Sequence, residues 1–252
     1  MQKHSLHIVR SWKMCGRVLF LEVMMGKPGY FTKGEVALWL GSVLLIAASF
    51  LIFDRENYMT LIASLIGATS LILCAKGNPI GQVLIIVFAV LYGVISYGYA
   101  YYGEMITYLG MSAPMALLAL ISWLKNPYNG KRSEVKVNSI KGREVIFMLL
   151  LAAVVTVLFY FILGWFGTAN LIPSTLSVTT SFIAAYLVFR RSPFYALAYA
   201  FNDAVLIVLW VLASMEDISY ISVTVCFTAF LANDIYGFVN WLRMQKRQSE
   251  SK

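Results

Sequence analysis

Two aspartates lie in the middle of long apolar segments of the chain. Asp203 is within residues 194–213, and Asp234 is within residues 218–242. Ionisable groups are costly to bury in an apolar medium, and the sequence has no Lys or Arg at comparable depth to pair with either. Each carboxyl group must therefore be hydrogen-bonded, protonated or open to a wet cavity. The aspartates are the first candidates for a functional site, with interhelical hydrogen bonding as the alternative role.

Helical spacing groups other polar and aromatic residues with these aspartates. Tyr199, Asp203 and Trp210 are separated by four and seven residues, so they fall on one stripe of a helix. Ser222 and Asn233 fall on a second polar stripe of the last segment. In the first half, Tyr92, Ser96 and Tyr99 line one face of residues 80–101. Polar and aromatic stripes in both halves predict a small-molecule site where the halves meet. The predicted binding residues are Gln82, Tyr92, Tyr108, Tyr199, Asn202, Asp203, Trp210, Ser222, Asn233 and Asp234.

The residue types in this site restrict the ligand. Two carboxylates without a base disfavour an anionic or phosphorylated compound, which would need Arg or Lys. A neutral polyhydroxy compound or a cation fits better, and aromatic faces beside a carboxylate suit a delocalised organic cation. Neither the histidines, His4 and His7, nor the three cysteines have metal-site spacing. We therefore expect no metal, no cofactor and no catalytic residue.

An intramembrane enzyme with a catalytic aspartate pair is an alternative from a different class. The segment lengths place Asp234 about one helical turn away from the depth of Asp203. Carboxyl groups that share a proton must lie at the same depth and nearly in contact. The predicted offset therefore argues against such a pair.

The composition identifies the elements that must position this site. Hydrophobic residues make up 60% of the chain, charged residues 13%, and the mean hydropathy is +0.75. A soluble domain has roughly 25% charged residues, so this chain is predicted to be an all-α integral membrane protein. A spanning helix needs about 20 apolar residues. Eight segments approach that length: 36–53, 60–76, 80–101, 105–124, 145–166, 171–189, 194–213 and 218–242.

The charges between these segments predict their direction. With the N-terminus in the cytoplasm, 19 of the 20 Lys and Arg residues fall on the cytoplasmic side, and Arg55 is the exception. The net charge of +8 is then a topology signal and does not indicate nucleic-acid binding. Both termini are expected to be cytoplasmic. Residues 5–25, which are too charged to span, are predicted to form an interfacial amphipathic helix.

Weak internal similarity predicts a repeat. Residues 64–68 (SLIGA) match 181–185 (SFIAA) at an offset of 117, and 121–125 (ISWLK) match 239–243 (VNWLR) at an offset of 118. Because an even number of spans separates the matches, the repeats are predicted to be parallel. The predicted organisation is 1–35 interfacial segment, 36–59 extra N-terminal helix, 60–124 first three-helix bundle, 125–170 basic loop and linker helix, 171–242 second three-helix bundle, and 243–252 basic tail.

Two further sets of residues are expected to be structural. Trp123 and Trp241, which lie beside basic residues at the ends of segments, are predicted to anchor the chain at the membrane interface. Ser174, Ser177 and Ser181 form a ridge of small residues that favours close helix packing.

Three segments resemble the Pnu-type bacterial vitamin transporters, in particular their nicotinamide riboside branch. They are 102–108 (YGEMITY), 202–210 (NDAVLIVLW) and 234–241 (DIYGFVNW), and the resemblance covers about residues 36–243. It implies a three-plus-one-plus-three helix core like that of the SWEET sugar transporters. It also implies substrate contacts for Asn202, Asp203, Trp210 and Asn233.

The resemblance further implies facilitated diffusion of a dephosphorylated vitamin, which a cytosolic kinase then traps for NAD biosynthesis. Nicotinamide riboside carries a pyridinium cation and a ribose, in agreement with the site chemistry above. Residues 192–195 (SPFY) stand where family members tend to have a Glu and Trp pair, so transport of thiamine, riboflavin or a sugar stays open. A proton-coupled symporter also stays open. The expected location is the bacterial inner membrane, with the lipid bilayer as partner and a homo-oligomer left open.

Overall fold

The structure, a computed structural model, describes residues 30–98, 102–168 and 170–251 of the 252-residue chain. The predicted interfacial helix at 5–25 lies outside these residues. The contacts divide the chain into two units, residues 1–37 and residues 38–252. In the first unit, Thr32 and Glu35 cap the start of α2 reciprocally, because each side chain accepts a hydrogen bond from the backbone N–H of the other at 3.2 and 2.6 Å.

The described residues are almost entirely helical. The helices are α2 (Lys33–Phe53), α3 (Tyr58–Ala75), α4 (Pro79–Gly98), α5 (Tyr102–Ile106), the π-helix η1 (Thr107–Ser112), α6 (Ala113–Lys125), α7 (Gly142–Trp165), α8 (Leu171–Phe189), α9 (Tyr195–Ser214), the 3-10 helix η2 (Ile218–Tyr220) and α10 (Ile221–Glu250). With α5, η1 and α6 counted as one span, eight helices among the described residues are long and apolar enough to cross a membrane. This confirms the predicted all-α membrane fold.

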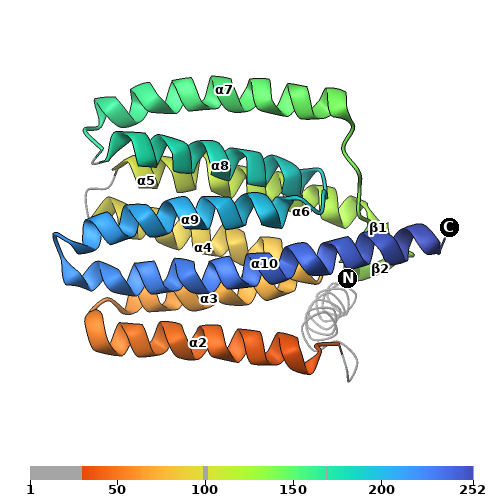
Figure 1. Cartoon of the computed structure of the whole chain (residues 1–252), viewed down its shortest axis with the longest axis horizontal. Coiled ribbons are helices and arrows are strands. Elements are labelled where there is room, and N and C mark those ends of the chain that lie inside the picture. Colours follow the sequence, from red (N-terminus) through yellow and green to blue (C-terminus); the bar gives the residue numbers. More distant parts are fainter. Residues whose placement is uncertain (1–29, 99–101, 169, 252) are drawn as a thin grey trace, which may run out of the picture. The chain divides into compact units, whose positions relative to one another are not determined.

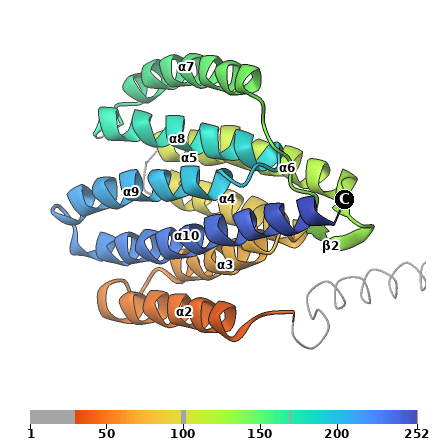
Figure 2. The same cartoon turned by 45° about the vertical axis from the view of Figure 1, so that its right-hand side comes forward.

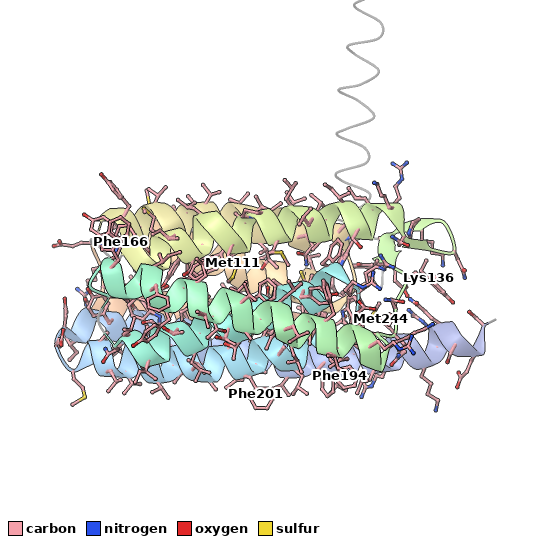
Figure 3. The ribbon with its side chains drawn as sticks, turned by 90° about the horizontal axis from the view of Figure 1, so that it is seen from above. Met111, Lys136, Phe166, Phe194, Phe201 and Met244 are labelled. Atoms are coloured by element: carbon pink, nitrogen blue, oxygen red, sulfur yellow. The ribbon has the colours of Figure 1, made fainter. Side chains whose placement is uncertain are left out.

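Within residues 38–252 the helices run alongside one another (Figures 1 and 2). α10 packs against α9 and α3, α6 packs against α4 and α8, and α7 packs against α8. We call the end with residues 76–78, 125–141 and 190–193 the basic end, and the end with 54–57 and 215–219 the acidic end. Figure 3 shows Lys136 at the first and Phe166 at the opposite one. Most of α7 is exposed, which suits a helix that meets lipid.

Large exposed apolar side chains cover the outside of this core. Phe201, for example, is 64% exposed and points away from the other helices in Figure 3. A water-soluble protein would not expose so much contiguous apolar surface, whereas lipid covers it at no cost. The sequence therefore places its polar residues inside and its apolar residues outside along the spans.

We call α3, α4 and α5–α6 the first bundle, and α8, α9 and α10 the second bundle. The turn between the first two helices is built in the same way in each of these groups. Gly77 N–H donates to Cys74 O at 2.8 Å, and Arg191 N–H donates to Val188 O at 2.9 Å. Both turn residues have a positive φ, +67° for Gly77 and +57° for Arg191. These equivalents are offset by 114 residues, which differs by three from the 117 of the sequence match. When two helix sequences are aligned with an error of about one helical turn, their apolar residues still fall on the same face. A weak apolar similarity therefore does not determine the exact offset between the two bundles.

The connection between the bundles forms a strap across the basic end, where a loop was predicted. Strands β1 (Pro127–Tyr128) and β2 (Lys131–Val135) form a hairpin, and its turn contains Asn129 and Gly130 with positive φ. Val135 N–H then donates to Gly77 O at 2.9 Å, and Asn138 N–H donates to Arg191 O at 3.0 Å. The strap, residues 135–138, thus binds the turn of each bundle.

Helix α10 continues past the predicted end of the last span at residue 242. It extends to Glu250, so the segment predicted as a basic tail is helical. Met244 and Gln248 are buried there, and Gln248 accepts a hydrogen bond from Val137 N–H at 2.8 Å. Contacts with the strap therefore account for the longer helix.

Candidate functional site

The two predicted aspartates meet in the middle of the membrane core. Asp203 on α9 is 3% exposed, Asp234 on α10 is 4% exposed, and the two carboxyl groups lie within interaction range of each other. No N–H or O–H group in the described part of the chain donates to Asp203 Oδ2.

The expectation that these residues lie at different depths was wrong. Asp203 is 11 residues from the end of α9 at Ser214, and Asp234 is 13 residues from the start of α10 at Ile221. The difference of two residues amounts to about 3 Å along the axis, which side chains bridge easily. The depth of each aspartate depends on where its helix ends or begins. The sequence did not show that residues 215–220 lie outside both α9 and α10.

Phenol and thiol groups surround the carboxyl pair. Tyr108, Tyr199 and Cys226 lie within electrostatic range of Asp203. Cys74 lies within range of Asp234 and accepts a hydrogen bond from Gln82 Nε2, which is 3.2 Å from its sulfur. Of the predicted residues, Tyr108 and Tyr199 therefore lie near the carboxyl pair, and Gln82 contacts Cys74 beside it.

An aromatic cluster lies beside the pair between the two bundles. The rings of Tyr92 and Tyr108 are 4.6 Å apart, those of Phe88 and Tyr92 are 5.5 Å apart, and Phe230 packs edge-on against Phe88 at 5.8 Å. Phe227 joins the cluster through Phe230 at 5.6 Å. Our sequence analysis missed the three phenylalanines. Their spacing of four (88 and 92) and three (227 and 230) could have found them.

Tyr108 lies in a π-helical turn, η1, within the span that α5 and α6 complete. Such turns interrupt the regular hydrogen-bond ladder and are common at functional sites. Here the irregular turn presents Tyr108 to Tyr92 and keeps it within electrostatic range of Asp203.

Asn202 connects α9 to α8. Its Oδ1 accepts hydrogen bonds from Thr180 at 2.8 Å, Ser181 at 3.0 Å and Ser177 at 3.4 Å. The predicted serine ridge on α8 thus does pack closely, but it also orients the amide next to Asp203.

Two small pockets open toward the acidic end. The Glu104 pocket has a volume of about 10 Å³ and is lined by Gly103, Glu104, Thr107, Tyr108, Leu163, Thr168, Ser174, Ser177, Val178 and Ser181. The Trp210 pocket has a volume of about 30 Å³ and is lined by Asp54, Asn57, Thr60, Tyr92, Ile95, Ser96, Trp210, Ser219, Tyr220 and Val223. The contact between Tyr92 and Tyr108 separates the two pockets, since each ring lines one of them.

Three predicted binding residues lie away from the pair. Trp210 packs against Tyr220 with ring centroids 5.5 Å apart, in the pocket near the acidic end. Asn233 donates from Nδ2 to Ser42 on α2 at 2.8 Å, so it faces the N-terminal helix. Ser222 donates to Ser219 O in the preceding 3-10 helix, η2. The structure does not bring these three side chains to the carboxyl pair.

The basic end is closed by reciprocal contacts between the bundles. Trp123 Nε1 donates to Val188 O at 3.0 Å, and Trp241 Nε1 donates to Cys74 O at 2.9 Å. Neither tryptophan is exposed, and their rings are 5.4 Å apart. We call these contacts the tryptophan lock. The expectation that both residues anchor the chain at the membrane interface was therefore wrong. A Trp near the end of a span can also satisfy a carbonyl at the end of a neighbouring helix.

The neighbouring residues repeat this exchange. Ser122 Oγ donates to Phe189 O, and Asn240 Nδ2 donates to Ala75 O, both at 2.8 Å. Side chains of α6 thus donate to two carbonyls at the end of α8, and side chains of α10 donate to two carbonyls at the end of α3. At this same end Arg190 pairs with Glu144 of α7, and that hydrogen bond raises the pKa of Arg190.

Carboxylates mark the acidic end. Partial burial raises the pKa of Asp54, and the nearby Asp217 and Glu56 raise it further. Asp217 instead accepts a hydrogen bond from Ser219 N–H at 2.9 Å, which lowers its pKa. The acidic end therefore attracts cations, in contrast to the basic end.

This arrangement defines a multi-pass membrane protein with a polar centre between two helical bundles. The sequence profile described as "Nicotinamide mononucleotide transporter" matches residues 57–243. The chain therefore belongs to the nicotinamide mononucleotide transporter family.

Comparisons with individual proteins support this family assignment. The chain is 24% identical over 217 residues to the nicotinamide riboside transporter PnuC of Neisseria mucosa, covering 84% of this chain and 82% of that protein. It is 23% identical over 212 residues to the protein of the same name from Haemophilus influenzae, covering 83% and 90%. It also shares its fold with the vitamin B3 transporter PnuC, known from a crystal structure, with a TM-score of 0.76, 22% identity, and coverage of 88% and 95%.

Proposed function

We propose that the chain carries nicotinamide riboside across the membrane, with the pyridinium ring held between the carboxyl pair and the aromatic cluster. The observation that carries this proposal is the buried contact of Asp203 with Asp234, beside Tyr92 and Tyr108. A delocalised cation gains both charge attraction from the carboxyl groups and contact with the ring faces. The names of the two relatives support the choice among organic cations.

The same site disfavours the mononucleotide for which the family is named. The phosphate of a mononucleotide requires Arg, Lys or a helix N-terminus to neutralise its charge. All Lys and Arg residues of the membrane core lie at its ends in the sequence, whereas the carboxyl pair lies at its centre. The dephosphorylated riboside is therefore the better match.

Transport by alternating access fits the difference between the ends. In this structure the tryptophan lock closes the basic end, and the two pockets lie at the acidic end. We infer that substrate enters at the acidic end when the Tyr92–Tyr108 contact separates, and leaves when the lock opens. Facilitated diffusion is sufficient where a cytosolic kinase phosphorylates the product and so prevents its return.

The orientation proposed with this function places the basic end in the cytoplasm of a bacterial inner membrane. A cysteine at Lys136, which is exposed at the basic end, tests it in a background with Cys15 replaced by serine. An impermeant thiol reagent added to intact cells should leave this cysteine unlabelled. The same reagent should label a cysteine at Met215, which is 80% exposed near the acidic end. The reverse labelling pattern would refute the orientation.

Uptake by proteoliposomes tests the substrate. Purified protein should take up labelled nicotinamide riboside without an imposed ion gradient, and unlabelled riboside should compete better than nicotinamide mononucleotide, thiamine, riboflavin or sucrose. Asp203→Asn should impair uptake. Thr228→Val is a matched control, because Thr228 is exposed on α10 and its hydroxyl bonds only within its own helix. Equal competition by the mononucleotide would contradict the proposal.

A further inference from the structure

The strap, residues 135–138, divides its backbone hydrogen bonds between the two bundles. Its first two amides bond to the first bundle. Val135 N–H donates to Gly77 O in the turn between α3 and α4, and Lys136 N–H donates to Asn126 O at the end of α6, both at 2.9 Å. The first half of the strap is therefore fastened to the first bundle by backbone groups alone.

The second half of the strap bonds to the second bundle. Val137 N–H donates to Gln248 Oε1 of α10 at 2.8 Å, and Asn138 N–H donates to Arg191 O in the turn between α8 and α9 at 3.0 Å. The side-chain amide of Asn138 adds a bond to Arg190 O at 3.1 Å. The bonding partner thus changes from one bundle to the other in the middle of the strap, so the strap bridges the two bundles.

The end of α10, residues 243–250, holds the strap and the hairpin before it. Gln248 is 6% exposed, and its Nε2 donates to Val135 O at 3.1 Å and to Glu134 Oε1 at 2.9 Å. Arg247 forms an ion pair with the same carboxylate. The Gln248 amide therefore uses both its oxygen and its nitrogen to bind the strap and the end of the hairpin.

The strap is attached more firmly to the first bundle than to the second. It follows the hairpin directly along the chain, the hairpin follows α6, and β2 packs against α4 and α6 of the first bundle. Most hydrogen bonds from the strap to the second bundle involve a side chain. A side chain can leave its partner by changing rotamer, without movement of the backbone. The strap should therefore move with the first bundle when the bundles part at the basic end.

Helix α10 also carries half of the tryptophan lock. Trp241 donates to Cys74 O of the first bundle, and Gln248 holds the strap. The two side chains are seven residues apart on one face of a continuous helix. Because α10 moves as one element, it cannot withdraw Trp241 from the first bundle without also withdrawing Gln248 from the strap.

We propose that the strap and the end of α10 form a latch on the basic end, which must release before the tryptophan lock opens. This inference rests on the proposed function, since it concerns the step of alternating access that opens the basic end. The end of α10 then leaves the strap in every transport cycle. Fastening the latch should stop transport, and weakening it should favour the conformation that is open at the basic end.

A reversible crosslink tests whether the latch must release. Ser139, which follows the strap, and Gln245 of α10 are hydrogen-bonded, with Oγ and Nε2 2.9 Å apart. Both are replaced by cysteine in a background whose three native cysteines are serine. The purified protein is treated with a short, reducible bifunctional thiol reagent and then reconstituted. Uptake of labelled nicotinamide riboside should fall by at least about tenfold, because a conformational step is blocked. Uptake should recover when the crosslink is reduced.

A crosslink within the hairpin is the matched control. Tyr128 and Lys131 are paired in register across the turn between β1 and β2. Cysteines at these two positions join parts that move together with the first bundle. The same treatment should therefore leave uptake by this variant unchanged.

Gln248→Ala tests the latch without a transport assay. It removes three hydrogen bonds to the strap and the hairpin, so the conformation open at the basic end should gain population. In a background with Cys15 and Cys226 replaced by serine, a thiol reagent should modify Cys74 about tenfold faster, as the loss of one or two ordinary hydrogen bonds would produce. Ser249→Ala is the control, because this residue is exposed and its hydroxyl bonds only within α10.

The outcomes distinguish the latch from the proposed function. Uptake that is equal before and after confirmed crosslinking of positions 139 and 245 would overturn the latch and leave the function standing. Absence of riboside uptake before crosslinking would contradict the function, and the reactivity of Cys74 would then decide the latch by itself. Equal reactivity of Cys74 in Gln248→Ala and Ser249→Ala would overturn the latch. If Gln248→Ala does not fold, the crosslink decides.

Discussion

The two ends of the membrane core differ in what holds them closed. At the basic end, side chains of each bundle donate to terminal carbonyls of the other, and the strap bonds to both turns. At the acidic end, two pockets are separated by the contact of Tyr92 with Tyr108. Opening the basic end takes a side-chain donor from each of four backbone carbonyls, whereas parting two tyrosine rings takes a donor from none. The acidic end should therefore open more easily from this conformation.

The largest expected effect comes from removing half of the tryptophan lock. Trp241→Ala deletes a fully buried ring and removes one of the two donors to Cys74 O, which keeps its hydrogen bond from Gly77 N–H. Truncating a buried Trp destabilises a protein by about 3–5 kcal/mol. The melting temperature in detergent should fall markedly. In a background with Cys15 and Cys226 replaced by serine, Cys74 should become reactive toward a thiol reagent.

Two other tryptophan variants serve as controls for the lock. Trp241→Phe keeps an aromatic ring but removes the indole donor, so it should cost about 0.5–1.5 kcal/mol for one lost hydrogen bond to Cys74 O, which still accepts from Gly77 N–H. Trp165→Ala should have little effect on stability, because Trp165 is 87% exposed. Unchanged reactivity of Cys74 in Trp241→Ala would show that the lock does not close the basic end.

Gly67→Ala disturbs the centre, between the two ends. A Cβ at Gly67 would lie 2.4 Å from Cζ of Phe230, so the ring would have to move. Overpacking of this kind costs about 1–3 kcal/mol, and the displaced ring should also lower substrate affinity. Gly41→Ala is the matched control, since a Cβ there meets no atom within 4 Å. Equal melting temperatures and affinities for the two variants would contradict the packing argument.

Asp203→Asn distinguishes a binding centre from a structural hydrogen bond. The substitution preserves size and hydrogen bonding but removes the charge, so affinity for the riboside should fall by about 1–3 kcal/mol. Measuring both Kd and the melting temperature separates the two roles. A lower melting temperature with unchanged Kd in the folded protein would remove Asp203 from the site.

The sequence predicted the spans and the central aspartates, because hydropathy and buried charge are local signals. It did not predict how the helices meet. Trp123 and Trp241 fit an interfacial pattern, and only their positions opposite Val188 O and Cys74 O show that they hydrogen-bond across the bundles. Asn233 shares a stripe with polar residues of α10, yet it donates to Ser42 on a helix that the resemblance treats as extra. Partners on other helices depend on register and crossing, which periodicity along one helix does not contain.

The smallest expected effect comes from Asp54→Asn at the acidic end. Burial and nearby carboxylates raise the pKa of Asp54 above its ordinary value of 3.8, so the folded protein holds this proton more tightly than the unfolded chain does. The stabilisation from this proton is complete at pH values below the ordinary pKa, and it is lost as the pH rises through the raised pKa.

At neutral pH the Asp54 carboxylate therefore disfavours the fold relative to a neutral amide. Asp54→Asn should raise the melting temperature slightly there, within about 0.5 kcal/mol, as is usual for a partly exposed surface position. The gain should disappear as the pH falls below the ordinary pKa of Asp54, where the wild-type carboxyl group is protonated in both states. Glu250→Gln at the far end of α10, away from the acidic end, is the control for removal of a carboxylate and should leave the melting temperature at neutral pH unchanged. A stability difference that grows on acidification would contradict the sign, and with it the argument that like charges destabilise the acidic end.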